Sequence, residues 1–164
     1  MDGANDFQIR RATVDDIPAL VRHRCEMFKD MDQLRPETYD ILAEATARYF
    51  AEAIPAGSYV AWVATPGANP GIVVAGGGML LRQIAPRPDA DGRLLKPGLQ
   101  GLVMNVYTEK EWRRTGLGEF VMQTVIDWSR ANGVVSLVLH ASSMGRPLYE
   151  RLGFTSTNEM SLQL

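Results

Sequence analysis

Three segments of the chain repeat apolar residues at the spacing of an α-helix. Thr13 is placed to cap the first helix, with Asp16 three residues further on, and its apolar stripe runs from Ile17 to Phe28. Pro36 opens the second helix, because proline is favoured in a first helical turn. The predicted helices span residues 13–28, 36–53 and 117–131.

Other segments are rich in alternating, β-branched or aromatic side chains, which predicts strands. These segments are residues 7–11, 58–64, 72–84, 102–108, 134–139 and 154–162, the last as a strand or a hairpin. Since residues 134–139 are mostly apolar, we expect that strand in the middle of a sheet. Pro147 and Gly153 favour a short helix between the last two strands.

The order of these elements predicts a single α+β domain over residues 1–164. Gly76-Gly77-Gly78 lacks the spacing of a nucleotide-binding loop, so we expect a β-bulge or a close backbone approach there. Residues 85–100 contain three prolines and mixed charges, which favours a surface loop at the rim of a site.

The composition of the chain indicates which partners it disfavours and where in the cell we expect the protein. The chain has 164 residues, 46% hydrophobic, and a formal net charge of −2, which argues against a broad nucleic-acid or anionic-membrane surface. The single cysteine, Cys25, cannot form an internal disulfide. Neither a signal peptide nor a run of about 20 apolar residues is evident, so we expect a cytoplasmic protein.

A strand, a short glycine-bearing loop and a helix start follow one another between residues 102 and 120. The loop is Arg113-Arg114-Thr115-Gly116-Leu117-Gly118. Backbone N–H groups at a helix N-terminus are unpaired and lie at the positive end of the helix dipole. Glycines permit close approach of an anion, and arginines can add charge-assisted hydrogen bonds. The segment therefore predicts a diphosphate site.

Two motifs in this order resemble the GNAT superfamily, the acyl-CoA-dependent N-acetyltransferases. They are the Arg-x-x-Gly-x-Gly loop and the later segment Leu148-Tyr149-Glu150-Arg151-Leu152-Gly153-Phe154. The resemblance implies a mixed, mostly antiparallel central sheet that splays at its two middle strands and is flanked by helices. It also implies acetyl-CoA as co-substrate, with no metal. The cofactor-binding residues that it implies are Val106, Tyr107, Thr108, Arg113, Arg114, Thr115, Gly116, Leu117, Gly118 and Glu119.

Tyr149 matches the tyrosine that lies near the thioester sulfur in this superfamily. Attack by an amine expels a thiolate, and a phenol can protonate it. The alternative is that Tyr149 only packs beside Leu148 and Leu152. Where many members of the superfamily have asparagine before this helix, the chain has Ser142 and Ser143, and the resemblance implies a cofactor contact from Ser142.

The sequence does not settle which group accepts the proton of the amine. Asn105 is the polar residue on the central strand, and an amide cannot act as a base at neutral pH. Glu26 and His140 are candidates for the acceptor site, although each could equally be a surface or structural residue. His23 is expected at the surface. No cluster has the spacing of metal ligands.

The resemblance implies direct acetyl transfer to a primary amine of a small molecule or a peptide, and it is compatible with a homodimer. An alternative is a non-catalytic acyl-CoA-binding sensor or regulatory module, which would bind acetyl-CoA without steady thiol release. A third hypothesis, a mononucleotide-binding α/β protein, predicts nucleotide binding that CoA does not compete with.

Overall fold

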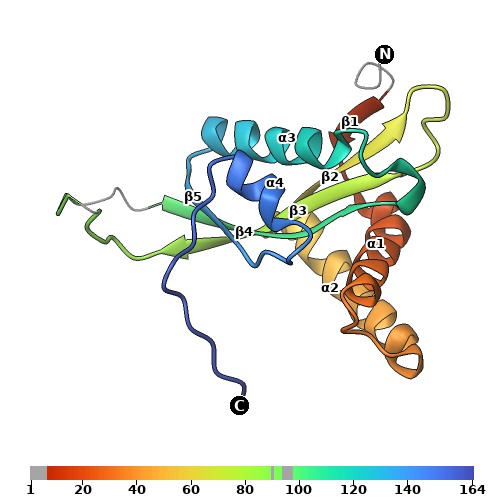
Figure 1. Ribbon diagram of the computed structural model, residues 1–164, viewed down its shortest axis with the longest axis horizontal. Helices are drawn as coiled ribbons and strands as arrows, with labels where there is room; N and C mark the ends of the chain where they lie inside the picture. The colour runs from red at the N-terminus through yellow and green to blue at the C-terminus, as the bar shows by residue number, and fades with distance from the viewer. Residues whose placement is uncertain (1–6, 90, 94–97) are drawn as a thin grey trace.

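The computed structural model describes residues 7–89, 91–93 and 98–164, as a sheet with helices on both faces (Figure 1). Short 3₁₀ turns precede helices α1 and α2 and follow strand β4. The elements are β1 (Phe7–Arg11), α1 (Ile17–Asp30), α2 (Tyr39–Ala56), β2 (Tyr59–Pro66), β3 (Ala75–Ile84), β4 (Gly98–Thr108), α3 (Leu117–Ala131), β5 (Val134–Leu139) and α4 (Arg146–Arg151).

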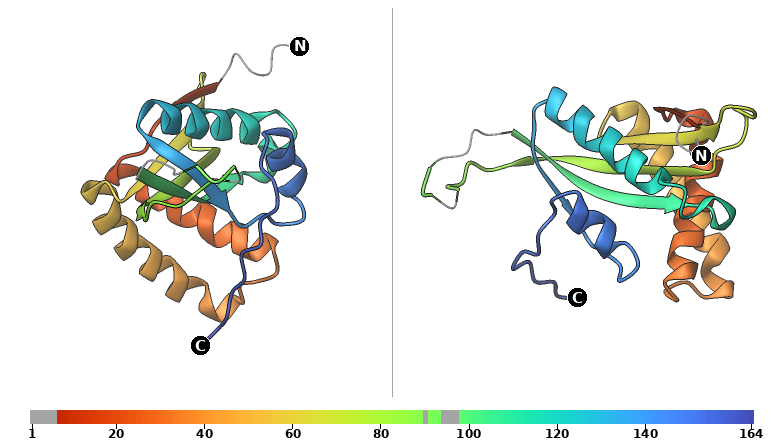
Figure 2. Two further views of the ribbon diagram at one scale, coloured as in Figure 1. Left: turned by 90° about the vertical axis from the view of Figure 1, so that its left-hand side faces the viewer. Right: turned by 45° about the horizontal axis from the view of Figure 1, so that its top comes forward.

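The strands of this sheet are in the order β1-β2-β3-β4-β5, antiparallel except for the parallel pair β4–β5. Helix α3 covers one face, and helices α1 and α2 cover the other (Figure 2, left). The predicted fold class, a mixed and mostly antiparallel sheet flanked by helices, is confirmed.

Strand β2 shows how alternation along the chain builds two cores. Tyr59, Ala61 and Val63 belong to the apolar cluster beneath α1 and α2. Val60 and Trp62 belong to the cluster beneath α3, which includes Met122 and Val125. All five strand residues are buried because both faces of the strand are covered.

The capping box that the sequence predicts closes the 3₁₀ turn Val14–Asp16, which leads directly into α1. Thr13 donates its backbone N–H to Asp16 (2.8 Å), and Arg10 on β1 donates two hydrogen bonds of 2.8 Å to the same carboxylate. These contacts lower the pKa of Asp16, Arg10 contributing most. The pair joins β1 to the helix that forms one wall of the site.

A β-bulge interrupts the pairing of β3 with β4. Gly76 pairs with Tyr107 and Gly78 with Met104, so two residues of β4 lie opposite Gly77. Asn105, one of the two, has a φ of 62°, a conformation that asparagine tolerates better than most residues. The irregularity predicted at the glycine run is confirmed, but the additional residue lies in β4.

Strands β4 and β5 pair only over the first half of β4. Their register ends at Val103 and Leu139, whereas β4 continues to Thr108. Two expectations about this end of the sheet were wrong. Strand β5 lies at the edge of the described sheet and not in its middle. Residues 154–164 form no helix or strand and extend away from the sheet, so no described strand pairs with β5 on its outer side (Figure 1).

Smaller differences concern the ends of elements. The second helix continues three residues beyond the predicted end, to Ala56, and Gly57 closes it with a φ of 73°. Part of the predicted 85–100 loop is strand, because β4 begins at Gly98. Residues 90 and 94–97 of that loop lie outside the described residues. No helix in the described part of the chain is long and apolar enough to cross a membrane.

Candidate active site

A cleft of about 910 Å³ opens where β4 and β5 diverge. One end is formed by the loop before α3, the floor by β4, and the walls by α1 on one side and by the segment from β5 to α4 on the other. The lining side chains from α1 and the turn after it, which the sequence analysis missed, are Arg24, Met27, Phe28, Asp30, Met31 and Gln33.

The loop before α3 has the backbone of an anion site. Gly116 is the N-cap residue with a φ of 84°, and Arg114 also has a positive φ, 62°. Glycine provides no capping side chain, so the first N–H groups of the helix are left for a ligand or water. A Cβ built on Gly116 would meet no atom within 4 Å, and Gly118 also lines the cleft. The predicted loop is therefore open toward the cleft at the helix N-terminus.

Arg113 is engaged within the protein. Its guanidinium donates to Asp30 on α1 and to the carbonyl oxygen of Thr108 (3.0 Å), and lies 5.3 Å from the ring centroid of Tyr107. Asp30 also contacts Lys110 at 3.2 Å. These partners hold the loop against the C-terminus of α1. Arg113 thus shapes the anion site while its own charge is largely matched by Asp30.

The remaining predicted residues of the loop differ in what they expose. Thr115 donates its hydroxyl to the carbonyl oxygen of Trp112 (2.6 Å). Leu117 is buried in the core, so it can offer a ligand only its main chain. Glu119 lies 3.7 Å from Arg151 of α4. Arg114 is exposed at the cleft and has no carboxylate within ion-pair distance among the described residues.

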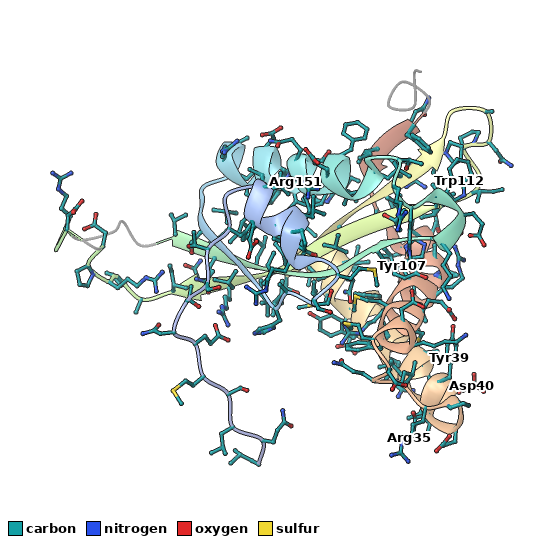
Figure 3. The ribbon with its side chains drawn as sticks, in the orientation of Figure 1. Arg35, Tyr39, Asp40, Tyr107, Trp112 and Arg151 are labelled. Carbon is teal, nitrogen blue, oxygen red and sulfur yellow. The ribbon has the colours of Figure 1, made fainter. Side chains whose placement is uncertain are left out.

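The predicted strand residues Val106, Tyr107 and Thr108 line the cleft on the stretch of β4 that continues past the end of β5. Within the described part of the chain, no strand pairs with the main-chain groups on that side, although the carbonyl oxygen of Thr108 accepts a hydrogen bond from Arg113. Tyr107, which is labelled in Figure 3, is buried. The centroid of its ring lies 5.2 Å from that of His23 on α1. The main-chain groups of Tyr107 are directed toward β3, where Tyr107 pairs with Gly76, so the main chain on the cleft edge of β4 comes from Val106 and Thr108.

Tyr149 and Ser142 lie on the opposite wall. Tyr149 is half-buried at the cleft and packs edge-to-face on Phe154, with ring centroids 5.9 Å apart. Burial raises the pKa of its phenol, so the phenol keeps its proton at neutral pH. Ser142 accepts a hydrogen bond from the backbone N–H of Gly145 (3.1 Å), which fixes the turn that leads into α4.

Of the three residues considered for the acceptor side, two line the cleft and one does not. Asn105 is buried at the cleft and lies in the β4 bulge. His140 also lines the cleft; it is 77% exposed and contacts Glu159 at 3.2 Å. Glu26 lines a separate pocket of about 230 Å³ and accepts a hydrogen bond from Tyr39. The structure therefore places Asn105 and His140, but not Glu26, in the cleft.

His23 corrects a further expectation, since it is buried and not at the surface. Its Nε2 lies 3.3 Å from Glu109, and its Nδ1 has no hydrogen-bond partner among the residues that the structure describes. Burial lowers the pKa of the imidazole, with Arg22 adding to the effect, so the ring is neutral at pH 7. The signal was present in the sequence: His23 follows Leu20 by three residues, on the apolar side of the helix.

Comparison with known proteins agrees with this arrangement. The family model of the acetyltransferase (GNAT) domain matches residues 58–156. A GCN5-related N-acetyltransferase from Ralstonia eutropha is 28% identical, with a TM-score of 0.81 over 96% of this chain and 98% of that one. A predicted acetyltransferase with acetyl-CoA from Clostridium acetobutylicum is 26% identical, with a TM-score of 0.76 over 96% and 95%.

Glucosamine-6-phosphate N-acetyltransferase from Arabidopsis thaliana shares the fold, with 18% identity and a TM-score of 0.66 over 96% of this chain and 97% of that one. A search of curated proteins found no match.

Proposed function

This chain belongs to the acetyltransferase (GNAT) domain family, and we propose that it transfers the acetyl group of acetyl-CoA directly to a primary amine of a small molecule or a peptide. The observation that carries this proposal is the cleft between the diverging strands β4 and β5. It joins an open helix N-terminus, an unpaired strand edge and a half-buried phenol in one continuous space.

Each part of the cleft suits one part of acetyl-CoA. The N–H groups at the start of α3, with exposed Arg114, would bind the pyrophosphate. The main-chain groups of Val106 and the N–H of Thr108, on the cleft edge of β4, would hydrogen-bond the amide groups of the pantetheine arm. The arm would extend β4 in the way that a peptide adds a strand to a sheet edge.

The proposed reaction needs no covalent intermediate on the protein. The amine nitrogen forms a bond to the acetyl carbon, the carbon–sulfur bond breaks, and Tyr149 donates its proton to the departing thiolate. The amine loses its own proton to His140 or to water. His140 suits this role better than Asn105 or Glu26, because it lies in the cleft, can accept a proton and is open to solvent.

A thiol-release screen tests the proposal. The protein is mixed with acetyl-CoA and a panel of primary amines, and free thiol is followed over time. We expect steady release that depends on the amine, with many turnovers per protein molecule. Binding of acetyl-CoA without amine-dependent release would support the sensor or regulatory module instead.

A further inference from the structure

Arg24 lies on the α1 wall of the cleft, opposite the segment that carries Tyr149. It donates a hydrogen bond of 2.6 Å from Nη1 to Oδ1 of Asn105. A guanidinium has five N–H donors. This is the one hydrogen bond that Arg24 makes within the described part of the chain, so other donors remain for a ligand.

The position of Arg24 is set from below by a buried network. Arg24 can only donate, so Asn105 must face it with oxygen and not with its NH₂ group. The Nδ2 of Asn105 then donates to the hydroxyl oxygen of fully buried Tyr59 (2.9 Å). The chain Arg24–Asn105–Tyr59 therefore holds a cation directly above the β4 bulge.

The other charges of the cleft are mostly matched by neighbours. Asp30 is shared by Arg113 and Lys110, and Glu119 lies close to Arg151. Among the described residues, no carboxylate lies within ion-pair distance of Arg24 or Arg114. Arg114 belongs to the loop before α3, where the pyrophosphate is proposed to bind. Arg24 is thus the cation left for the acceptor.

The surroundings of Arg24 are apolar. Its guanidinium carbon lies 4.9 Å from the ring centroid of Phe28, and Met27 and Met31 line the same wall. All three apolar side chains are half-buried. A charge-assisted hydrogen bond is stronger where neighbouring side chains exclude water. Methionine and phenylalanine can also pack against an apolar substituent of varied shape.

We propose that Arg24 binds a carboxylate of the acceptor, so that the preferred substrate is an amine carrying one carboxylate close to the amino group and an apolar side chain. This inference rests on the proposed acetyl transfer. A single unmatched cation fits a carboxylate better than a phosphate dianion, because one charge balances one charge. The apolar side chain of the substrate packs on Met27, Phe28 and Met31.

Matched pairs of acceptors test the charge directly. L-methionine is compared with L-methioninamide, and L-phenylalanine with L-phenylalaninamide, each pair differing at the carboxylate. Because an amide substituent lowers the basicity of the amino group, kcat/KM is calculated on the unprotonated amine. We expect the acid to exceed its amide by about 10- to 100-fold, the range for a hydrogen bond to a charged group. Glycine, which lacks the apolar side chain, should be poorer than methionine.

Substitutions of Arg24 test the residue. Arg24→Gln should raise the KM of the acid, so that the ratio of kcat/KM for the acid to kcat/KM for its amide falls to about one. The KM of acetyl-CoA should be unchanged. Arg24→Lys keeps the charge and should keep part of the preference, which also guards against misfolding of the glutamine variant. Arg22→Gln is the matched control: Arg22 is on the same helix but contacts Glu109, outside the cleft, so the ratio should not change.

The outcomes separate this inference from the proposed function. Equal turnover of acids and amides by the unaltered protein, or an unchanged ratio in Arg24→Gln, would overturn the role of Arg24 and leave acetyl transfer standing. If no amine of the broad screening panel causes thiol release, the proposed function is overturned and this inference with it. The structure predicts that Arg24→Gln loses the preference for the acid but still acetylates the amides, whereas Arg22→Gln keeps the preference.

Discussion

Tyr149 is a residue on which packing and chemistry act together. Its ring packs on Phe154 and belongs to the apolar cluster beneath α3, while its side chain lines the cleft. Burial raises the pKa of the phenol, so the proton stays available to a leaving thiolate over the whole neutral range. A packing role alone and a proton-donor role therefore make different predictions for the same substitution.

Tyr149→Phe keeps the ring and removes the proton donor. We expect kcat to fall by about 100-fold, the lower end for general acid catalysis, because a CoA thiolate is a good leaving group. The KM of acetyl-CoA should be unchanged. In the unaltered protein kcat should fall only above about pH 10, where a tyrosine of raised pKa loses its proton, and this decrease should be absent from the variant.

The matched control for this substitution is Tyr39→Phe. Tyr39 also has a raised pKa, chiefly through burial, but its hydroxyl donates to Glu26 outside the cleft. Its loss should leave kcat unchanged. An unchanged kcat in Tyr149→Phe from pH 6 to 10 would reduce Tyr149 to a packing residue, and a change confined to KM would make it a binding residue.

The buried phenol of Tyr59 makes the unfolding free energy depend on pH. It is fully buried, its hydroxyl oxygen accepts from Asn105, and burial places its pKa far above the ordinary value. Because the pKa of Tyr59 is raised in the native state, the stability that its protonated phenol contributes is fully present at neutral pH. That stability is lost as pH rises above about 10, because the unfolded chain then releases the proton and the native state does not.

Urea denaturation from pH 8 to 11 measures this effect. The unfolding free energy of the unaltered protein should fall more steeply above pH 10 than that of Tyr59→Phe. At neutral pH the variant should be less stable by about 1–3 kcal/mol, because the Nδ2 of Asn105 loses its acceptor. Parallel pH curves for the two proteins would show that the native phenol ionises as freely as the unfolded one.

Some residue-level features were beyond the sequence because they depend on contacts between distant segments. The Arg24–Asn105 hydrogen bond, for example, joins positions 81 apart, and nothing local to either residue indicates it. The conformation of Gly153 could be predicted, because the positive φ that it adopts follows from the local geometry of a helix C-terminus.

At the scale of elements, the loop and first turn of α3 decide whether the cleft can hold an anion. Gly116 combines a φ of 84° with open space around its missing Cβ. A branched side chain there would strain the backbone and would also occupy space beside the N–H groups of α3. Gly133, with a φ of 73° and equally open surroundings, lies after α3 at its other end. Comparing the same substitution at the two glycines therefore separates the effect of backbone strain from the effect on ligand binding.

Gly116→Val should weaken acetyl-CoA binding, whereas Gly133→Val should not, although each costs about 1–2 kcal/mol in backbone strain. Thermal unfolding with and without ligand measures both quantities. Acetyl-CoA at about 100 times its Kd for the unaltered protein should stabilise Gly133→Val by about 2.7 kcal/mol and Gly116→Val by much less. Equal stabilisation of the two variants would place the pyrophosphate elsewhere.

The elements that the sequence predicts well are those whose pattern needs no distant partner. Helices α1 and α3 follow the apolar periodicity of their sequences, and strand β2 follows a run of β-branched and aromatic residues. The tail, residues 154–162, was predicted to be a strand or a hairpin, yet it forms neither, and its apolar Met160 and Leu162 are exposed. Alternation indicates a surface that could pair, but a strand also needs a neighbour that offers hydrogen bonds.

At the scale of the whole molecule, the candidate site is a consequence of topology. Strands β4 and β5 are parallel neighbours joined through α3, and they separate after Val103 and Leu139. This separation opens the cleft beside the N-terminus of α3 and leaves Asn105 and Tyr149 on different sides of it. Motifs placed the loop and α4 in the sequence. The sequence also pointed to the first helix through Glu26, but the α1 residues that line the cleft emerged only from the fold.

The measurement that tests acetyl transfer most directly is a mass balance over many turnovers. With the best amine from the screen, free CoA thiol and N-acetylated amine are quantified in the same reaction by thiol titration and mass spectrometry. We predict that both accumulate in a 1:1 ratio far beyond the amount of protein, and that Tyr149→Phe slows both equally. Thiol without acetylated amine would indicate hydrolysis, and product limited to one equivalent of protein would contradict catalytic transfer.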